Sequence, residues 1–157
     1  MGAAGVPEFS EAFLNDFETL LKWRRDVRRF RRDPLPEGLL KRLLGLADLA
    51  PSVGNSQPWR IAIVGDPGRR ADIVAAFEAE NELAAKTFGG DRAQRYRQLK
   101  LAGLKEAPVH LAVFSDDDPD QGHGLGRRTM PETLAYSTVS MIHTFWLAAR
   151  AEGVGVG

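Results

Sequence analysis

Hydrophobic positions along the chain recur with helical spacing in several long blocks, and two shorter blocks between them have the character of strands. The first predicted helix begins at Ser10, a favourable N-cap residue, and its spaced hydrophobic positions are Phe13, Leu14, Phe17, Leu20 and Leu21. Leucines with the same spacing predict a second helix over residues 37–49, which Pro51 ends. The chain therefore opens with two amphipathic helices.

The later blocks continue this mixture of helices and strands. Strands are predicted over residues 60–64 and 109–114, and helices over residues 69–85, 92–104 and 131–150. A polar, glycine-rich loop over residues 115–128 precedes the last helix, and Gly153 is a natural C-cap for it. Because the interior of that last helix is almost wholly apolar, we expect it at the domain centre or at a subunit interface.

The end of the chain bears on the completeness of the fold. Residues 153–157 read Gly-Val-Gly-Val-Gly, which resembles the opening of another strand. Two strands alone do not make a stable sheet, so either partner chains complete the sheet or the sequence is a fragment; we favour a fragment. We expect one α+β domain over residues 1–157, with helices around a mainly antiparallel sheet, a C-terminal part missing and residues 1–9 flexible.

Composition narrows the classes of partner. Lys+Arg and Asp+Glu both number 21, so zero net charge gives no general attraction to nucleic acid or to an anionic membrane. There is no cysteine, no apolar run of about 18 residues and no signal peptide, which predicts a cytoplasmic location. The three histidines lack metal-ligand spacing, and the acidic stretch 116–122 departs from the calcium-loop pattern, so we expect no metal site.

The most distinctive feature is a segment, residues 24–32, that we call the arginine segment. Six of its nine residues are arginine, namely Arg24, Arg25, Arg28, Arg29, Arg31 and Arg32. Guanidinium groups bind phosphate oxygens through paired, charge-assisted hydrogen bonds. A solvated basic face or a nucleic-acid patch is the alternative. Flanking Trp23 and internal Phe30 favour an anchored ligand site, and Asp26 weakens a general polyanion surface.

A second feature is the polar turn, residues 52–57, between Pro51 and Pro58. It offers backbone and amide groups to the edge of a flat polar ring, next to Trp59. The alternative is a helix terminator that leads into an edge strand, for which Gly54 and Asn55 suit left-handed geometry. Together the two features suit a ligand with a phosphate at one end and a heteroaromatic ring at the other.

These residues resemble the flavin-dependent nitroreductase-like superfamily and, within it, the branch of BluB-type 5,6-dimethylbenzimidazole synthases. The superfamily's usual flavin turn reads Arg-Arg-Ser, and here Asp26 replaces the serine, as in that branch. The matching stretches are residues 24–28, 50–54, 57–59, 99–101, 124–127, 129–132 and 146–157.

The resemblance implies a nitroreductase-like, FMN-dependent fold built as a homodimer, with FMN at the subunit interface. Arg24, Arg25 and Arg28 would then hold the phosphate and ribityl end of FMN. The residues expected on the ring side are Ser52, Gly54, Gln57 and, nearby, Lys100. Asp26 corresponds to the acidic residue implicated in the chemistry of the synthase branch, either as a base or as an orienting group.

The resemblance also implies an enzyme that consumes FMN. Reduced FMN and dioxygen would give 5,6-dimethylbenzimidazole, the lower ligand of cobalamin, with NAD(P)H acting through a separate flavin reductase. The alternative is an FMN-dependent NAD(P)H nitroreductase or quinone oxidoreductase. No nucleic-acid or membrane partner is expected, and a chain that ends at Gly157 would lack one side of the site.

Overall fold

The first helix follows directly from the sequence pattern. The computed structural model describes residues 5, 7–85 and 101–157, and α1 spans Glu11–Trp23. The Ser10 hydroxyl accepts a hydrogen bond from the Phe13 N–H at 3.2 Å, so the predicted N-cap is confirmed. The prediction that residues 1–9 are flexible falls partly on residues 1–4 and 6, which lie outside the described residues.

The second helix is shorter than predicted. Helix α2 spans Leu39–Ala47 rather than residues 37–49. Its later start follows from Gly38, which takes a left-handed conformation (φ 75°) at the N-cap. A single 3₁₀ turn, η1 (Val53–Asn55), lies inside the polar turn, with Gly54 at φ 57°. The polar turn is therefore a compact element that links α2 to the first strand.

Two strands form an antiparallel pair. Strand β1 (Trp59–Ile63) pairs with β2 (Leu111–Ser115), with Trp59 opposite Ser115 and Ile63 opposite Leu111. Both strands were predicted, each within two residues of its observed bounds. The antiparallel pairing agrees with the predicted α+β class, and the sheet of the described residues has two strands.

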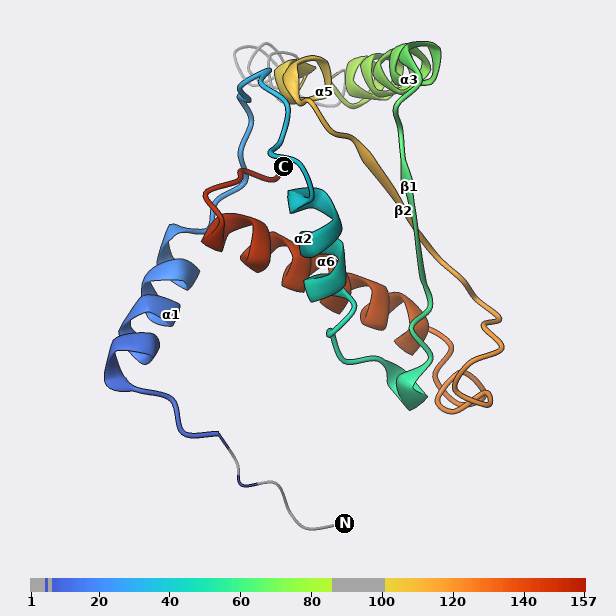
Figure 1. Ribbon diagram of the computed structural model, residues 1–157. Coiled ribbons are helices and arrows are strands. Elements are labelled where there is room, and N and C mark those ends of the chain that lie inside the picture. The colour runs from blue at the N-terminus through green and yellow to red at the C-terminus, as the bar shows by residue number, and fades with distance from the viewer. Residues whose placement is uncertain (1–4, 6, 86–100) are drawn as a thin grey trace.

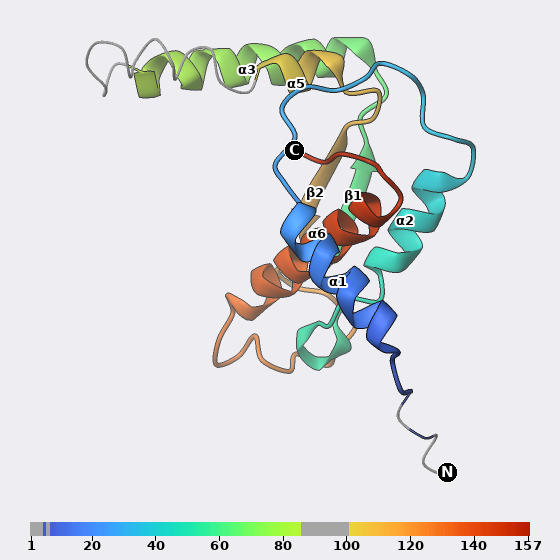
Figure 2. The same ribbon diagram turned by 90° about the vertical axis from the view of Figure 1, so that its left-hand side faces the viewer.

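Two helices lie together at the far end of these strands (Figures 1 and 2). Helix α3 spans Pro67–Ala85, and α5 spans Leu101–Glu106. The helix predicted over residues 92–104 lies outside the described residues up to residue 100, and its described part continues to Glu106 instead of ending at Leu104. α5 leads directly toward β2.

The last helix, α6 (Thr133–Ala151), is the centre of the molecule. It packs against α1, α2, η1 and both strands, as Figure 1 shows for α2 and the strands. The core that it closes contains Met141 of α6 together with Ala47, Ala50 and Trp59. The predicted central position is confirmed. Other α6 side chains stay exposed, including Tyr136 and Val139 at 60% and 61%.

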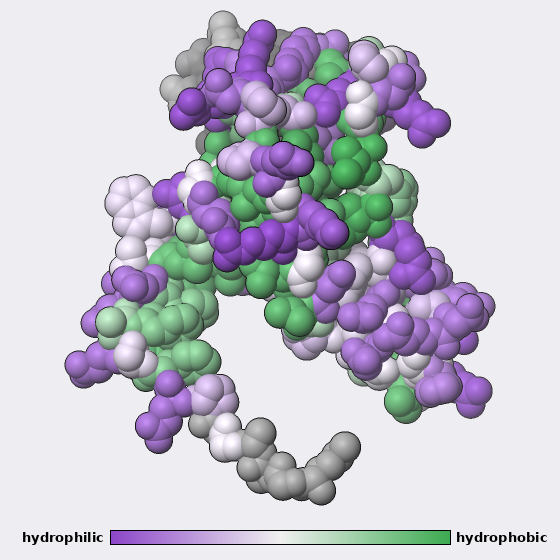
Figure 3. All heavy atoms as spheres, in the orientation of Figure 1, coloured by the Kyte–Doolittle hydropathy of each residue, from purple (hydrophilic) through white to green (hydrophobic). Residues whose placement is uncertain are grey.

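Helix α1 extends away from this core and buries none of its residues. Its hydrophobic face remains in contact with solvent, with Phe13, Leu14, Phe17 and Leu21 all between 43% and 54% exposed. Figure 3 shows hydrophobic residues on α1 and along the adjacent edge of the body. None of the described helices is sufficiently long and apolar to cross a membrane.

Candidate functional site

The arginine segment runs from the end of α1 past the C-terminus and on toward α5 (Figures 1 and 2). The Arg24 guanidinium lies over the Trp146 ring of α6, 4.9 Å from its centroid. A guanidinium over an indole face is attracted to the negative face of the ring. This contact fixes the first residue of the segment on the central helix.

The middle of the arginine segment pairs with the chain end. Asp26 and Val156 form an isolated parallel β-bridge, and the Val27 N–H donates to the Val156 carbonyl at 3.0 Å. A Cβ on Gly155 would lie 2.9 Å from a Val27 methyl, so glycine permits this close approach. Thus the predicted new strand at residues 153–157 begins as a single bridge beside Asp26.

Several arginines of the segment already have partners in the chain. Arg28 Nε lies 3.5 Å from an Asp26 oxygen, and Arg31 Nε lies 2.8 Å from Asp33. The Arg25 guanidinium folds back and donates to the backbone carbonyls of Lys22 and Arg24. Such internal pairing favours a structured site over a general polyanion-binding surface. Arg25 and Arg28 nevertheless remain exposed to solvent.

The polar turn is held by its own predicted site residues. The Ser52 hydroxyl accepts a hydrogen bond from the Gln57 N–H at 3.1 Å, and the Gln57 amide donates to the Asp48 carbonyl at 3.2 Å. The Val53 N–H donates to the Ser137 hydroxyl of α6 at 3.0 Å. Ser52 and Gln57 therefore fix the shape of the turn, whatever else they bind.

A second loop interlocks with the polar turn through glycines. This glycine loop, residues 121–127, approaches so closely that a Cβ on Gly54 would lie 2.7 Å from the Leu125 Cβ. A Cβ on Gly122 would lie 2.9 Å from the Ser56 Cβ and 3.0 Å from the Gly54 carbonyl oxygen. The Gln121 amide donates to the Asn55 carbonyl at 2.6 Å. Gly54 thus has a packing role, and the glycine loop packs directly against the polar turn.

We expect Gly122→Ala to destabilise the protein by about 2–4 kcal/mol. The added methyl meets backbone and Cβ atoms, and the φ of 89° is strained for alanine. The matched control is Gly45→Ala in α2, where no atom lies within 4 Å and alanine stabilises a helix by roughly 0.5–1 kcal/mol. Thermal unfolding of both variants tests this. Equal midpoints for the two variants would contradict the interlock.

The arginine segment and the polar turn attach to different parts of α6. Arg24 contacts Trp146, whereas Val53 contacts Ser137. These two positions of α6 are nine residues apart, about 14 Å along a helix axis. Lys100, the remaining predicted ring-side residue, lies outside the described residues. One chain therefore presents the two halves of the predicted site at separate places.

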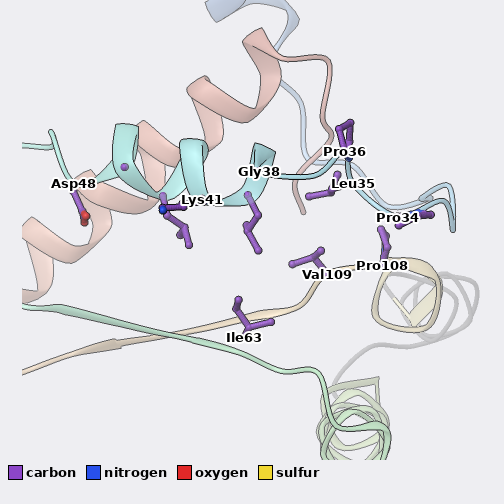
Figure 4. Close-up of a pocket in the computed structure, with 12 residues that line it drawn as sticks. Pro34, Leu35, Pro36, Gly38, Lys41, Asp48, Ile63, Pro108 and Val109 are labelled. Carbon is purple, nitrogen blue, oxygen red and sulfur yellow. The ribbon is translucent and has the colours of Figure 1, made fainter.

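A separate cavity of ≈ 780 Å³ lies between α2, the segment before it and the strands. Figure 4 shows Lys41 on α2, Asp48 just after it and Leu35 just before it, with Ile63 of β1 and Val109 across from them. Its lining is mostly apolar and contains no residue of the arginine segment or of the polar turn. Among the described residues of the lining Lys41 is the one cationic residue, whereas the predicted phosphate ligands lie on the arginine segment, so the cavity is not the predicted phosphate site.

Comparison with known proteins shows which family the chain belongs to. The family model described as "Nitroreductase family" matches residues 21–157. The chain belongs to the nitroreductase family. The resemblance inferred from the sequence is confirmed, and so is the predicted nitroreductase-like fold.

Within the nitroreductase family, this chain is similar to 5,6-dimethylbenzimidazole synthases. The chain is 55% identical to 5,6-dimethylbenzimidazole synthase of Rhodospirillum rubrum, over 96% of this chain and 72% of that protein. A synthase of Rhodobacter capsulatus is 48% identical, over 95% of this chain and 72% of that protein. A crystal structure of iodotyrosine deiodinase bound to FMN and 3-iodo-L-tyrosine superimposes with a TM-score of 0.70 and 28% identity, over 88% and 71% of the two chains.

Sequence reasoning missed two acids that hold the polar turn and the arginine segment in place. Asp48 accepts a hydrogen bond from the Trp59 indole at 2.9 Å, and Glu106 accepts from the Phe30 N–H at 3.2 Å. Neither acid has a local signal, because its partner lies outside its own helical turn, 11 residues away for Asp48 and 76 for Glu106. Gly122 did carry a signal, since a glycine cluster in a polar loop indicates close backbone approach.

Proposed function

We propose that this protein fragments reduced FMN with dioxygen to give 5,6-dimethylbenzimidazole, the lower ligand of cobalamin. The observation that carries the proposal is the 55% identity to a 5,6-dimethylbenzimidazole synthase across nearly the whole chain. Asp26 agrees with it, because the resemblance places an acid here in the synthase branch, where the usual flavin turn has a serine. An FMN-dependent NAD(P)H nitroreductase is the less supported alternative.

The residues present fit FMN. Exposed Arg25 and Arg28 offer cationic groups to the phosphate, and the polar turn offers amide groups to the ring edge. When bound, reduced FMN supplies both the electrons that dioxygen takes up and the ring system that is fragmented. Arg24, Arg25 and Arg28 would bind and orient the phosphate end, and Ser52, Gly54 and Gln57 would meet the ring side, where the resemblance also expects Lys100. Asp26 accepts a proton or orients the ribityl hydroxyls.

A homodimer completes this site. The separate attachment of its two halves to α6 is explained if the arginine segment of one protomer meets the polar turn of its partner. Phe17 on α1 and Val139 on α6, 43% and 61% exposed, belong to apolar surfaces that this chain leaves uncovered. Uncovered apolar helix faces of this kind mark protein–protein contacts.

The reducing equivalents come from NAD(P)H through a separate flavin reductase. A flavin enclosed between two subunits leaves little room for a nicotinamide, so reduction precedes binding. The cytoplasmic location expected from the sequence stays a prediction.

The activity is tested by incubating the full-length protein with chemically reduced FMN and air, followed by mass spectrometry. We expect 5,6-dimethylbenzimidazole to form as FMN disappears. Intact FMN with release of hydrogen peroxide would contradict the proposal. Rapid NAD(P)H oxidation with a nitroaromatic acceptor, and no ring cleavage, would establish the alternative.

The shared site predicts complementation between inactive variants. Arg25→Ala and Gln57→Ala disable opposite halves of the site, so a mixed dimer contains one intact site and one doubly altered site. Random refolding of an equal mixture makes about half of the dimers mixed, and we expect about a quarter of wild-type activity. Product formation by the mixture, compared with each variant alone, measures this. No gain on mixing would place both halves in one chain.

A further inference from the structure

The arginine segment is anchored at its far end by a single carboxylate on α5. Glu106 Oε2 accepts a hydrogen bond from the Phe30 N–H at 3.2 Å, and Glu106 Oε1 pairs with Arg29 Nη1 at 3.0 Å. The Glu106 side chain is 20% exposed, whereas that of Arg29 is 81% exposed. Glu106 therefore binds both the backbone and a side chain of a segment that has no regular secondary structure of its own.

The surface of α5 is shaped for this contact. A Cβ on Gly103 would lie 3.1 Å from the Phe30 ring and 3.5 Å from the Arg28 carbonyl oxygen. Glycine at this position lets the segment lie directly on the helix, one turn before Glu106. Two residues of α5 thus determine where the backbone between Arg28 and Phe30 lies.

The charge of Glu106 suits an anchor. The hydrogen bond from the Phe30 N–H, together with the nearby charges of Arg29 and Arg32, holds the pKa of Glu106 below its ordinary value despite partial burial. Glu106 is consequently ionised at neutral pH. Its pairing with Arg29 also holds that guanidinium at α5, so Arg29 is not expected to bind the phosphate.

We propose that Glu106 is a positioning residue for the phosphate of FMN, acting through Phe30 and Arg29 to hold Arg28 in place. This inference rests on the proposed function. It separates the arginines into ligand groups and an anchor, with Arg29 as the anchor. Among the described residues, the first half of the segment is held by the Arg24–Trp146 contact and the Asp26–Val156 bridge, and the second half by α5. Loss of Glu106 removes the polar anchor of that second half and leaves the packing of Phe30 on Gly103.

The test compares two flavins that differ in the phosphate alone. In the full-length protein, Glu106→Ala should raise the Kd of FMN roughly three- to tenfold, the effect of losing an ordinary hydrogen bond. The Kd of riboflavin should change less than about twofold. Glu106→Gln keeps an acceptor for the Phe30 N–H but loses the charge, and should fall between wild type and Glu106→Ala. Fluorescence quenching measures all of these constants.

Glu78→Gln is the matched control. Glu78 of α3 pairs with Lys105 of α5 at 3.0 Å, so its ion pair joins two helices and does not involve the arginine segment. Its FMN affinity should equal that of wild type. Equal weakening of both flavins by Glu106→Ala, or unchanged FMN binding in both Glu106 variants, would overturn the inference. Wild-type protein that binds no FMN would instead refute the proposed function itself.

Discussion

Replacing Asp26 by asparagine is expected to suppress 5,6-dimethylbenzimidazole formation by roughly 10²–10⁴-fold, the usual contribution of a positioned general acid or base. FMN binding should change only slightly. The Asp26 backbone carries the bridge to Val156, and the substitution leaves that backbone unaltered. Asparagine keeps an oxygen toward Arg28 Nε, which lies 3.5 Å from the carboxylate, but cannot take up a proton. Product yield in a single turnover and the Kd of FMN are measured on the same preparation.

The matched control for this prediction is Asp33→Asn. Asp33 is also an exposed acid paired with an arginine close by, at 2.8 Å from Arg31 Nε. It lies beyond the end of the arginine segment, so both product yield and FMN affinity should stay near wild type. If Asp26→Asn lowered FMN binding as much as product yield, Asp26 would be a ligand-orienting group without a specific chemical role.

Replacing Arg25 by alanine is expected to weaken FMN binding roughly 10- to 150-fold. A hydrogen bond to a charged group contributes roughly 1.5–3 kcal/mol, and this range converts to that loss of affinity. Arg25 is exposed beside the end of α1, where its guanidinium now donates to the Lys22 and Arg24 carbonyls. To bind a phosphate, the Arg25 guanidinium needs only to exchange these two carbonyl acceptors for the charged phosphate oxygens. Fluorescence titration with FMN measures the effect.

Riboflavin and a second arginine provide the controls for Arg25. Riboflavin lacks the phosphate, so its affinity should be nearly the same in wild type and Arg25→Ala. Arg31→Ala removes an arginine that is paired with Asp33 and whose side chain is 89% exposed, and FMN binding should be preserved. A similar loss for Arg31→Ala would point to diffuse attraction between charges, which salt would abolish.

Local patterns predicted much of this fold. The Ser10 cap, the leucine spacing of α2 and the apolar run of α6 each reflect contacts within a few turns of helix. The arginine segment and the polar turn were also visible, because six arginines in nine residues and a Ser-Val-Gly-Asn-Ser-Gln turn depart strongly from ordinary composition. Their assignment to FMN came from the family resemblance, since the residues alone left a basic surface and a helix terminator open.

The remaining features depend on contacts between distant residues. Glu106 reaches Phe30 across 76 positions of sequence, and Ser137 reaches Val53 across 84. Nothing near Glu106 distinguishes it from an ordinary surface acid. Helix α2 starts two residues later than predicted because Gly38 is left-handed, and the spacing of the leucines gives no sign of that conformation. The division of the site between two attachments on α6 also needed the structure.

The central claim is that FMN binds between two copies of the chain, with its phosphate on the arginine segment. A crystal structure of the full-length protein with FMN tests this most directly. We predict the phosphate within hydrogen-bonding distance of Arg25 and Arg28 of one protomer, and the ring edge against residues 52–57 of its partner. Arginines turned into bulk solvent, with FMN absent or bound at another place, would contradict the account.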